Sequence, residues 1–108
     1  MSPASNGEWR EAATESEFTA TDRKLLDFGE ELQVGLFKVD ERYYAISAWC
    51  SHEKRSLMTG DLDGYTLMCP HHGAQFDLRT GSKLSLPAVR PVPAYPVKVQ
   101  DGRIFVKV

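Results

Sequence analysis

The sequence has little cysteine, no long apolar run and no excess of either charge, and each shortage excludes a class of protein. Only two of its 108 residues are cysteines, too few for a disulfide-rich secreted scaffold. No apolar stretch approaches the roughly 20 residues of a membrane-spanning helix, and residues 1–8 lack the basic and apolar regions of a signal peptide. A formal net charge of -2 gives no general attraction to nucleic acid or anionic membranes. We therefore expect a cytoplasmic protein that binds neither nucleic acid nor membrane.

The composition that is present describes one ordinary folded domain. Hydrophobic residues make up 42% of the chain and charged residues 26%. A domain of this length buries about two thirds of the surface that its unfolded chain exposes, which is enough for a core without cross-links. We expect a flexible N-terminus over residues 1–7 and a single domain over residues 8–108.

Short segments with a period of two dominate the domain. Apolar residues alternate over residues 32–36 and then change phase at Phe37 and Val39, which predicts a β-bulge near Gly35. Further alternating segments predict half-buried strands over residues 42–48, 65–69, 76–78, 95–99 and 104–108.

Turn signals separate these strands, and helix signals are scarce. Asp40-Glu41 and Asp101-Gly102 each predict a tight hairpin turn. Residues 14–23 have too few apolar side chains for more than one helical turn. Four of the six prolines lie within residues 87–96 and exclude a helix there. The pattern predicts an all-β sandwich or small barrel.

Cysteine and histidine gather in two short segments. The first is Cys50-Ser51-His52, and the second is Cys69-Pro70-His71-His72-Gly73, with sixteen residues between His52 and Cys69. Each segment therefore mixes sulfur and nitrogen. A zinc finger with two cysteines and two histidines instead pairs its cysteines on a hairpin and its histidines on a helix. The arrangement here suits a two-iron centre better, and a structural zinc module stays as the alternative.

The pattern C-x-H, a spacer of this length and then C-x-x-H-G resembles the signature of Rieske [2Fe–2S] proteins, in which two histidines replace two cysteines on one iron. The likeness to soluble Rieske ferredoxins extends over residues 56–64, 76–81, 86–88 and 95–99. It implies a Rieske-type β-sandwich or barrel with a small cluster-binding subdomain at roughly residues 48–80.

The resemblance also implies which side chains hold the cluster. Cys50 and Cys69 would bind one iron through sulfur, and His52 and His72 would bind the other through nitrogen. The family spacing and the following glycine select His72, so that His71 is expected to be exposed and not a ligand.

Two departures from the family's high-potential members concern the reduction potential. Arg55 and His71 occupy the places where those members carry two further, disulfide-bonded cysteines. Ala74 and Phe76 occupy the places of a serine and a tyrosine that donate hydrogen bonds to sulfur. Since such hydrogen bonds raise the potential, we expect a value near the low end of the Rieske span of roughly -150 to +300 mV.

The function implied is that of a one-electron carrier and not an enzyme by itself. As a monomeric ferredoxin with one Rieske [2Fe–2S] cluster, it would accept electrons from a flavin-dependent reductase and pass them to a terminal oxygenase. Residues 69–81 resemble equally the small Rieske subunit of assimilatory nitrite reductase, which is the second reading.

Overall fold

The computed structural model describes residues 8–29, 32–49, 56–69, 74–82, 84 and 91–108. These residues form ten strands and one short 3-10 helix, η1, and none of them forms a helix long and apolar enough to cross a membrane. The elements in chain order are β1 (Trp9–Thr14), η1 (Glu15–Phe18), β2 (Arg23–Asp27), β3 (Gln33–Val39), β4 (Arg42–Ser47), β5 (Asp61–Asp63), β6 (Thr66–Met68), β7 (Gln75–Asp77), β8 (Ala94–Tyr95), β9 (Val97–Gln100) and β10 (Arg103–Lys107). The predicted all-β class is confirmed.

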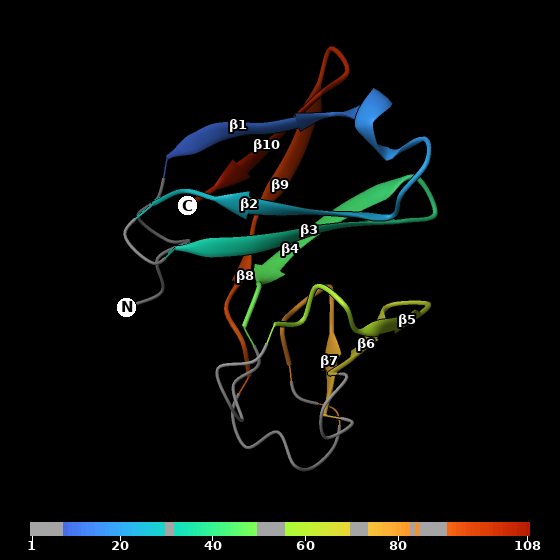
Figure 1. Cartoon of the computed structure of the whole chain (residues 1–108). Helices are drawn as coiled ribbons and strands as arrows, with labels where there is room; N and C mark the ends of the chain where they lie inside the picture. The colour runs from blue at the N-terminus through green and yellow to red at the C-terminus, as the bar shows by residue number, and fades with distance from the viewer. Residues whose placement is uncertain (1–7, 30–31, 50–55, 70–73, 83, 85–90) are drawn as a thin grey trace.

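Three antiparallel sheets organise the chain (Figure 1). The sheet β2-β3-β4-β8 packs on one side against β1-β10-β9 and on the other against the small sheet β5-β6-β7. Figure 1 shows the small sheet beyond the ends of β4 and β8, at one end of the molecule. The four-stranded sheet is therefore the layer shared by both halves of the fold.

Two hydrophobic clusters fill the spaces between these layers. The first, which we call the upper core, joins the two larger sheets and includes Val34, Leu36, Ala45, Ile104 and Val106. The second, the lower core, joins the four-stranded sheet to the small sheet. Its buried members are Phe37, Ile46, Leu57, Leu67, Cys69, Ala74, Phe76, Leu78 and Val92.

Strand β3 contributes to both cores, and this corrects the predicted bulge at Gly35. Its pairing with β4 runs without a shift from Val34 to Val39. Leu36 belongs to the upper core and Phe37 to the lower core, and both are fully buried. The apolar phase changes in the sequence because a central strand with both faces covered needs no polar face.

The two predicted hairpin turns are confirmed. Asp40 and Glu41 join β3 to β4 with φ of 50° and 66°, and Asp101 and Gly102 join β9 to β10 with φ of 54° and 76°. Positive φ at both central positions matches the right-handed twist of the flanking strands. The prediction of a single helical turn also holds, since η1 spans four residues after Thr14, whose N–H donates to Glu17 Oε2 at 2.7 Å.

Replacing Glu41 by glycine should stabilise the protein, because glutamate carries a Cβ into the left-handed region and glycine does not. The penalty for such a residue is about 1–2 kcal/mol, so Glu41→Gly should stabilise the fold by about 1 kcal/mol after its larger unfolded-state entropy is counted. Thermal unfolding measures this, with Glu41→Ala as the control for loss of the carboxylate. Equal melting temperatures for the alanine and glycine variants would contradict the interpretation.

Candidate metal centre

An isolated antiparallel β-bridge flanks residues 50–55, which contain the first Cys/His segment. Trp49 pairs with Ser56 across residues 50–55, and the Leu57 N–H donates to the Ala48 carbonyl at 2.7 Å. Serine hydroxyls hold the two ends locally, because Ser47 Oγ accepts from the Trp49 N–H at 3.2 Å and Ser56 Oγ accepts from the Met58 N–H at 3.1 Å. The chain thus enters and leaves this segment at one fixed place.

The second segment lies between two strands of the small sheet. Met68 at the end of β6 pairs with Gln75 at the start of β7. One step further, the Cys69 N–H donates to the Ala74 carbonyl at 2.7 Å, which closes the base of residues 70–73. Cys69 is a buried free thiol with 2% of its surface exposed. Cysteine sulfur is a common ligand of iron in proteins, so Cys69 offers a ligand atom at the base of this loop.

The bases of the two segments belong to one packed unit. Leu57, from the first, and Cys69 and Ala74, from the second, are all buried in the lower core. Asp61 pairs with Met68, and the backbone of Gly60 lies so close to the Met68 carbonyl oxygen that a Cβ there would collide with it. The fold therefore brings the described residues at the bases of the two segments, far apart in sequence, together at the same end of the molecule.

An aromatic and ionic cluster joins the small sheet to β4. The rings of Tyr44 and Tyr65 pack edge to face with centroids 5.6 Å apart, and the Arg79 guanidinium lies 4.6 Å from the Tyr65 centroid. Arg79 also donates to both carboxylate oxygens of Asp77, at 3.0 and 2.9 Å. These hydrogen bonds lower the pKa of Asp77, and burial followed by the Tyr65 hydroxyl raises the pKa of Tyr44. This aromatic and ionic cluster helps to hold the small sheet against the four-stranded sheet.

Of the four predicted ligands, Cys69 is the one that lies among the described residues. Cys50, His52 and His72 lie outside the described residues, as do His71 and Arg55. Ala74 and Phe76, which we expect at the places of the hydroxyl donors, are both fully buried in the lower core with Cys69. The buried thiol at the base of one segment and the common anchoring of both segments fit a centre held by two loops.

Sequence reasoning missed one residue that acts on this end of the molecule. Arg23, in β2, donates hydrogen bonds to the carbonyls of Met58 and Gly60, which follow the first segment. These contacts join residues 35 and 37 positions apart, and no local pattern indicates them.

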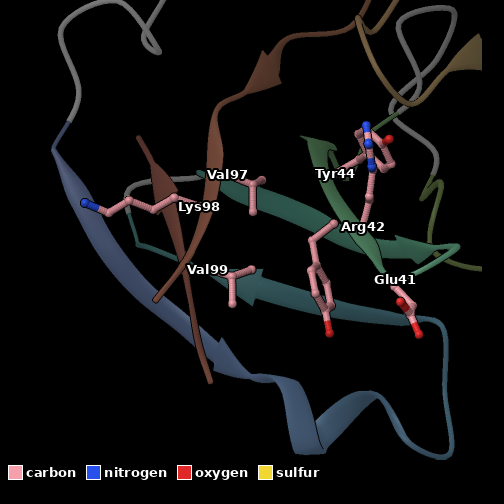
Figure 2. Close-up of a pocket in the computed structure, with 7 residues that line it drawn as sticks. Glu41, Arg42, Tyr44, Val97, Lys98 and Val99 are labelled. Atoms are coloured by element: carbon pink, nitrogen blue, oxygen red, sulfur yellow. The ribbon is translucent and has the colours of Figure 1, made fainter. Parts of the chain in front are cut away.

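A shallow pocket of about 300 Å³ lies elsewhere, between β4 and β9 (Figure 2). Residues 41–44 line one side and residues 97–99 the other. Its place on β4 is the end near the Asp40-Glu41 turn, whereas the opposite end of β4 leads towards Trp49. The pocket thus lies at the end of β4 opposite Trp49.

Comparison with known proteins identifies the family. The family model for the Rieske [2Fe-2S] domain matches residues 8–96. The 3-phenylpropionate/cinnamic acid dioxygenase ferredoxin subunit of Photorhabdus laumondii is 45% identical over 76 residues, which cover 69% of this chain and 72% of that protein.

Solved structures of similar fold agree over nearly the whole chain. In a complex of reduced oxygenase and oxidized ferredoxin of carbazole 1,9a-dioxygenase, one chain superposes with a TM-score of 0.87 and 27% identity, covering 94% of each chain. A putative NADH-dependent nitrite reductase small subunit from Mycobacterium tuberculosis has a TM-score of 0.79 and 26% identity, covering 94% of this chain and 96% of that one. The chain therefore belongs to the Rieske [2Fe–2S] domain family, and is an electron carrier with one Rieske-type [2Fe–2S] cluster.

Proposed function

We propose that the chain is a free-standing Rieske ferredoxin that accepts single electrons from a flavin-dependent reductase and delivers them to a terminal oxygenase. The observation that carries the proposal is the extent of the match. The chain covers most of a named ferredoxin subunit at 45% identity and 94% of a chain solved in an oxygenase–ferredoxin complex. A carrier of this kind needs the cluster and the fold that supports it. We propose that this chain works as a monomer in the cytoplasm.

We propose that Cys50 and Cys69 bind one iron and that His52 and His72 bind the other. The bound cluster supplies one-electron redox chemistry, and neutral histidine ligands raise its potential above that of clusters held by cysteine alone. Support comes from the buried Cys69 thiol and from the two segment bases packed in one core. We assign the cluster-binding subdomain to roughly residues 48–80, within a domain that runs from residue 8 to residue 108.

Exposed apolar side chains beside the two segments support transient docking at this end. Trp49, Met68 and Leu84 are three of the six large apolar side chains that are exposed among the described residues. Met68 and Leu84 both lie beside Gln75 in the small sheet, because Met68 pairs with it and the Leu84 N–H donates to its carbonyl. Small, partly apolar contacts are typical of short-lived electron-transfer complexes.

The second candidate is the Rieske subunit of an assimilatory nitrite reductase. It is favoured by the similarity to the nitrite reductase small subunit, which extends over 94% of this chain. Membership of a [2Fe–2S] family argues against the structural zinc module.

Electron transfer to defined partners distinguishes the two functions. The purified chain is reduced anaerobically and mixed in a stopped-flow instrument with the terminal oxygenase of the Photorhabdus laumondii 3-phenylpropionate system or with a nitrite reductase large subunit. We expect reoxidation at a rate that rises with oxygenase concentration and no stable complex on gel filtration. Rapid reoxidation by the nitrite reductase subunit alone, with co-elution, would favour the alternative.

The low reduction potential is tested by restoring the hydroxyl donors. Ala74→Ser and Phe76→Tyr should each raise the potential, since a donor stabilises the more negative reduced state. A hydrogen bond to a charged acceptor contributes about 1.5–3 kcal/mol, and about 1.4 kcal/mol corresponds to 59 mV for one electron. Voltammetry should therefore show increases of up to about 60–130 mV.

The control for these variants is Ala45→Ser, which places the same hydroxyl in the upper core, where Ala45 is 2% exposed. It should lower stability and leave the potential unchanged. A wild-type potential in the upper half of the Rieske span would contradict the interpretation of Ala74 and Phe76.

A further inference from the structure

Arg23 reaches from the four-stranded sheet to the chain that leaves the first Cys/His segment. Its Nη1 donates to the Met58 carbonyl at 2.9 Å and to the Gly60 carbonyl at 2.7 Å. Both contacts are partly buried. A single nitrogen of a β2 residue thus hydrogen bonds two carbonyls of the turn that leads into β5 of the small sheet.

The guanidinium is oriented by two further groups. Arg23 Nε donates to Asp22 Oδ1 at 2.8 Å, and Nη2 lies 3.4 Å from Asp22 Oδ2. The guanidinium carbon is 5.3 Å from the centroid of the Phe37 ring, within cation–π distance. Arginine hydrogen bonding lowers the pKa of Asp22, so the carboxylate stays charged over the ordinary pH range. These contacts hold the Arg23 guanidinium in the orientation from which it donates to the turn.

The turn over residues 56–60 is held through both its N–H and its carbonyl groups. The N–H groups of Leu57, Met58 and Gly60 donate to the Ala48 carbonyl, Ser56 Oγ and the Leu57 carbonyl. Arg23 provides donors for the Met58 and Gly60 carbonyls. Because Gly60 also lies against the Met68 carbonyl, this turn sets the spacing between the bases of the two segments.

We propose that Arg23 is a positioning residue for the cluster, which holds the turn at 56–60 so that the first ligand segment stays in register with the second. The inference rests on the proposed ligands Cys50, His52, Cys69 and His72. It assigns to a residue of β2, distant in sequence from all four, control over how firmly the cluster is held. Lysine cannot replace it, because an ammonium is a point donor and lacks the planar fork that binds Asp22 and two carbonyls together.

The test compares Arg23→Gln and Arg23→Lys with a matched control on the intact, cluster-loaded protein. Lys24→Gln removes one positive charge at the next position of β2, where Lys24 instead contacts the Ala12 carbonyl and Glu17. Three quantities are measured: the rate at which a ferrous chelator bleaches the visible absorption, hydrogen exchange over residues 48–60, and the EPR spectrum of the reduced protein.

For both Arg23 variants we expect bleaching at least about tenfold faster, since a partly buried carbonyl loses its donor. Exchange should increase over residues 56–60 while β3 and β4 stay protected, and the EPR signal should broaden. Lys24→Gln should match the wild type in all three measurements.

The contrary results are separable. Faster exchange at residues 56–60 with unchanged bleaching and an unchanged EPR spectrum would overturn the positioning role and leave the proposed function intact. Equal loss of protection throughout β2, β3 and β4 would show general destabilisation and would also overturn it. Wild-type protein without iron and sulfide would instead contradict the proposed function itself.

Discussion

His72→Ala is expected to abolish cluster binding, and His71→Ala is expected to leave it intact. The neighbouring histidines differ in their place within the motif: His72 is the histidine of C-x-x-H-G, which we propose as the iron ligand, and His71 precedes it. Removal of a ligand from a four-ligand centre leaves one iron with an open position, and we expect the iron and sulfide to be lost during purification. The measurement is iron and acid-labile sulfide per chain, with the visible absorption spectrum.

The His71→Ala variant is the matched control, since it removes the same ring one residue away. Cys69→Ser should give the same complete loss as His72→Ala. Because Cys69 is 2% exposed in the lower core, circular dichroism should accompany this variant to show that the strands remain. A protein that loses its colour through His71→Ala and keeps it through His72→Ala would refute the ligand assignment.

Gly81→Ala is expected to be the most destabilising glycine substitution outside the Cys/His segments. Gly81 has a φ of +76°, and a Cβ there would collide with the Val92 carbonyl oxygen. The Gly81 carbonyl also accepts the Val92 N–H at 2.9 Å, so the two backbones cannot separate without losing this hydrogen bond. Val92 belongs to the lower core, and its displacement would disturb the packing around Cys69.

The left-handed conformation costs about 1–2 kcal/mol for alanine, and forced repacking adds about 1–3 kcal/mol. We therefore expect a loss of about 3 kcal/mol and a fall in melting temperature of about 12 °C or more. Gly64→Ala is the control, because Gly64 also has a positive φ, of +59°, but a Cβ added there would have no atom within 4 Å. It should carry the conformational cost alone, which lowers the melting temperature by about 4–8 °C for each kcal/mol, and equal effects in the two variants would contradict the role of the Val92 contact.

The sequence predicted those parts of the fold in which one strand face meets one core. Exposed Met68 lies between Leu67 and Cys69, and half-buried Asp77 lies between Phe76 and Leu78. Leu67, Cys69, Phe76 and Leu78 are all buried in the lower core as expected. The turn at Asp101-Gly102 was also predictable, since its residue types are those that accept positive φ.

Other features depend on contacts that local sequence does not encode. The bulge predicted at Gly35 was wrong because β3 lies between two cores. Strand β2 carries adjacent leucines, of which Leu25 is 49% exposed and Leu26 is 5% exposed. Its sequence has no clear alternation of apolar and polar residues, and the strand is defined by its pairing with β3.

The candidate site also combines residues that the sequence predicts with one that depends on distant contacts. Cysteine and histidine spacing identified the two candidate segments, because coordination chemistry limits which residue types serve, and the resemblance to Rieske proteins selected the four proposed ligands. The role of Arg23 could not be predicted, since its partners are backbone carbonyls that any sequence would offer.

Iron and acid-labile sulfide analysis combined with EPR of the reduced wild-type protein tests the central claim most directly. Two irons and two sulfides per chain are predicted, with an average g value below that of the free electron, as expected for iron ligated by cysteine and histidine. One zinc per chain and no sulfide, in protein produced with ample iron, would contradict the account.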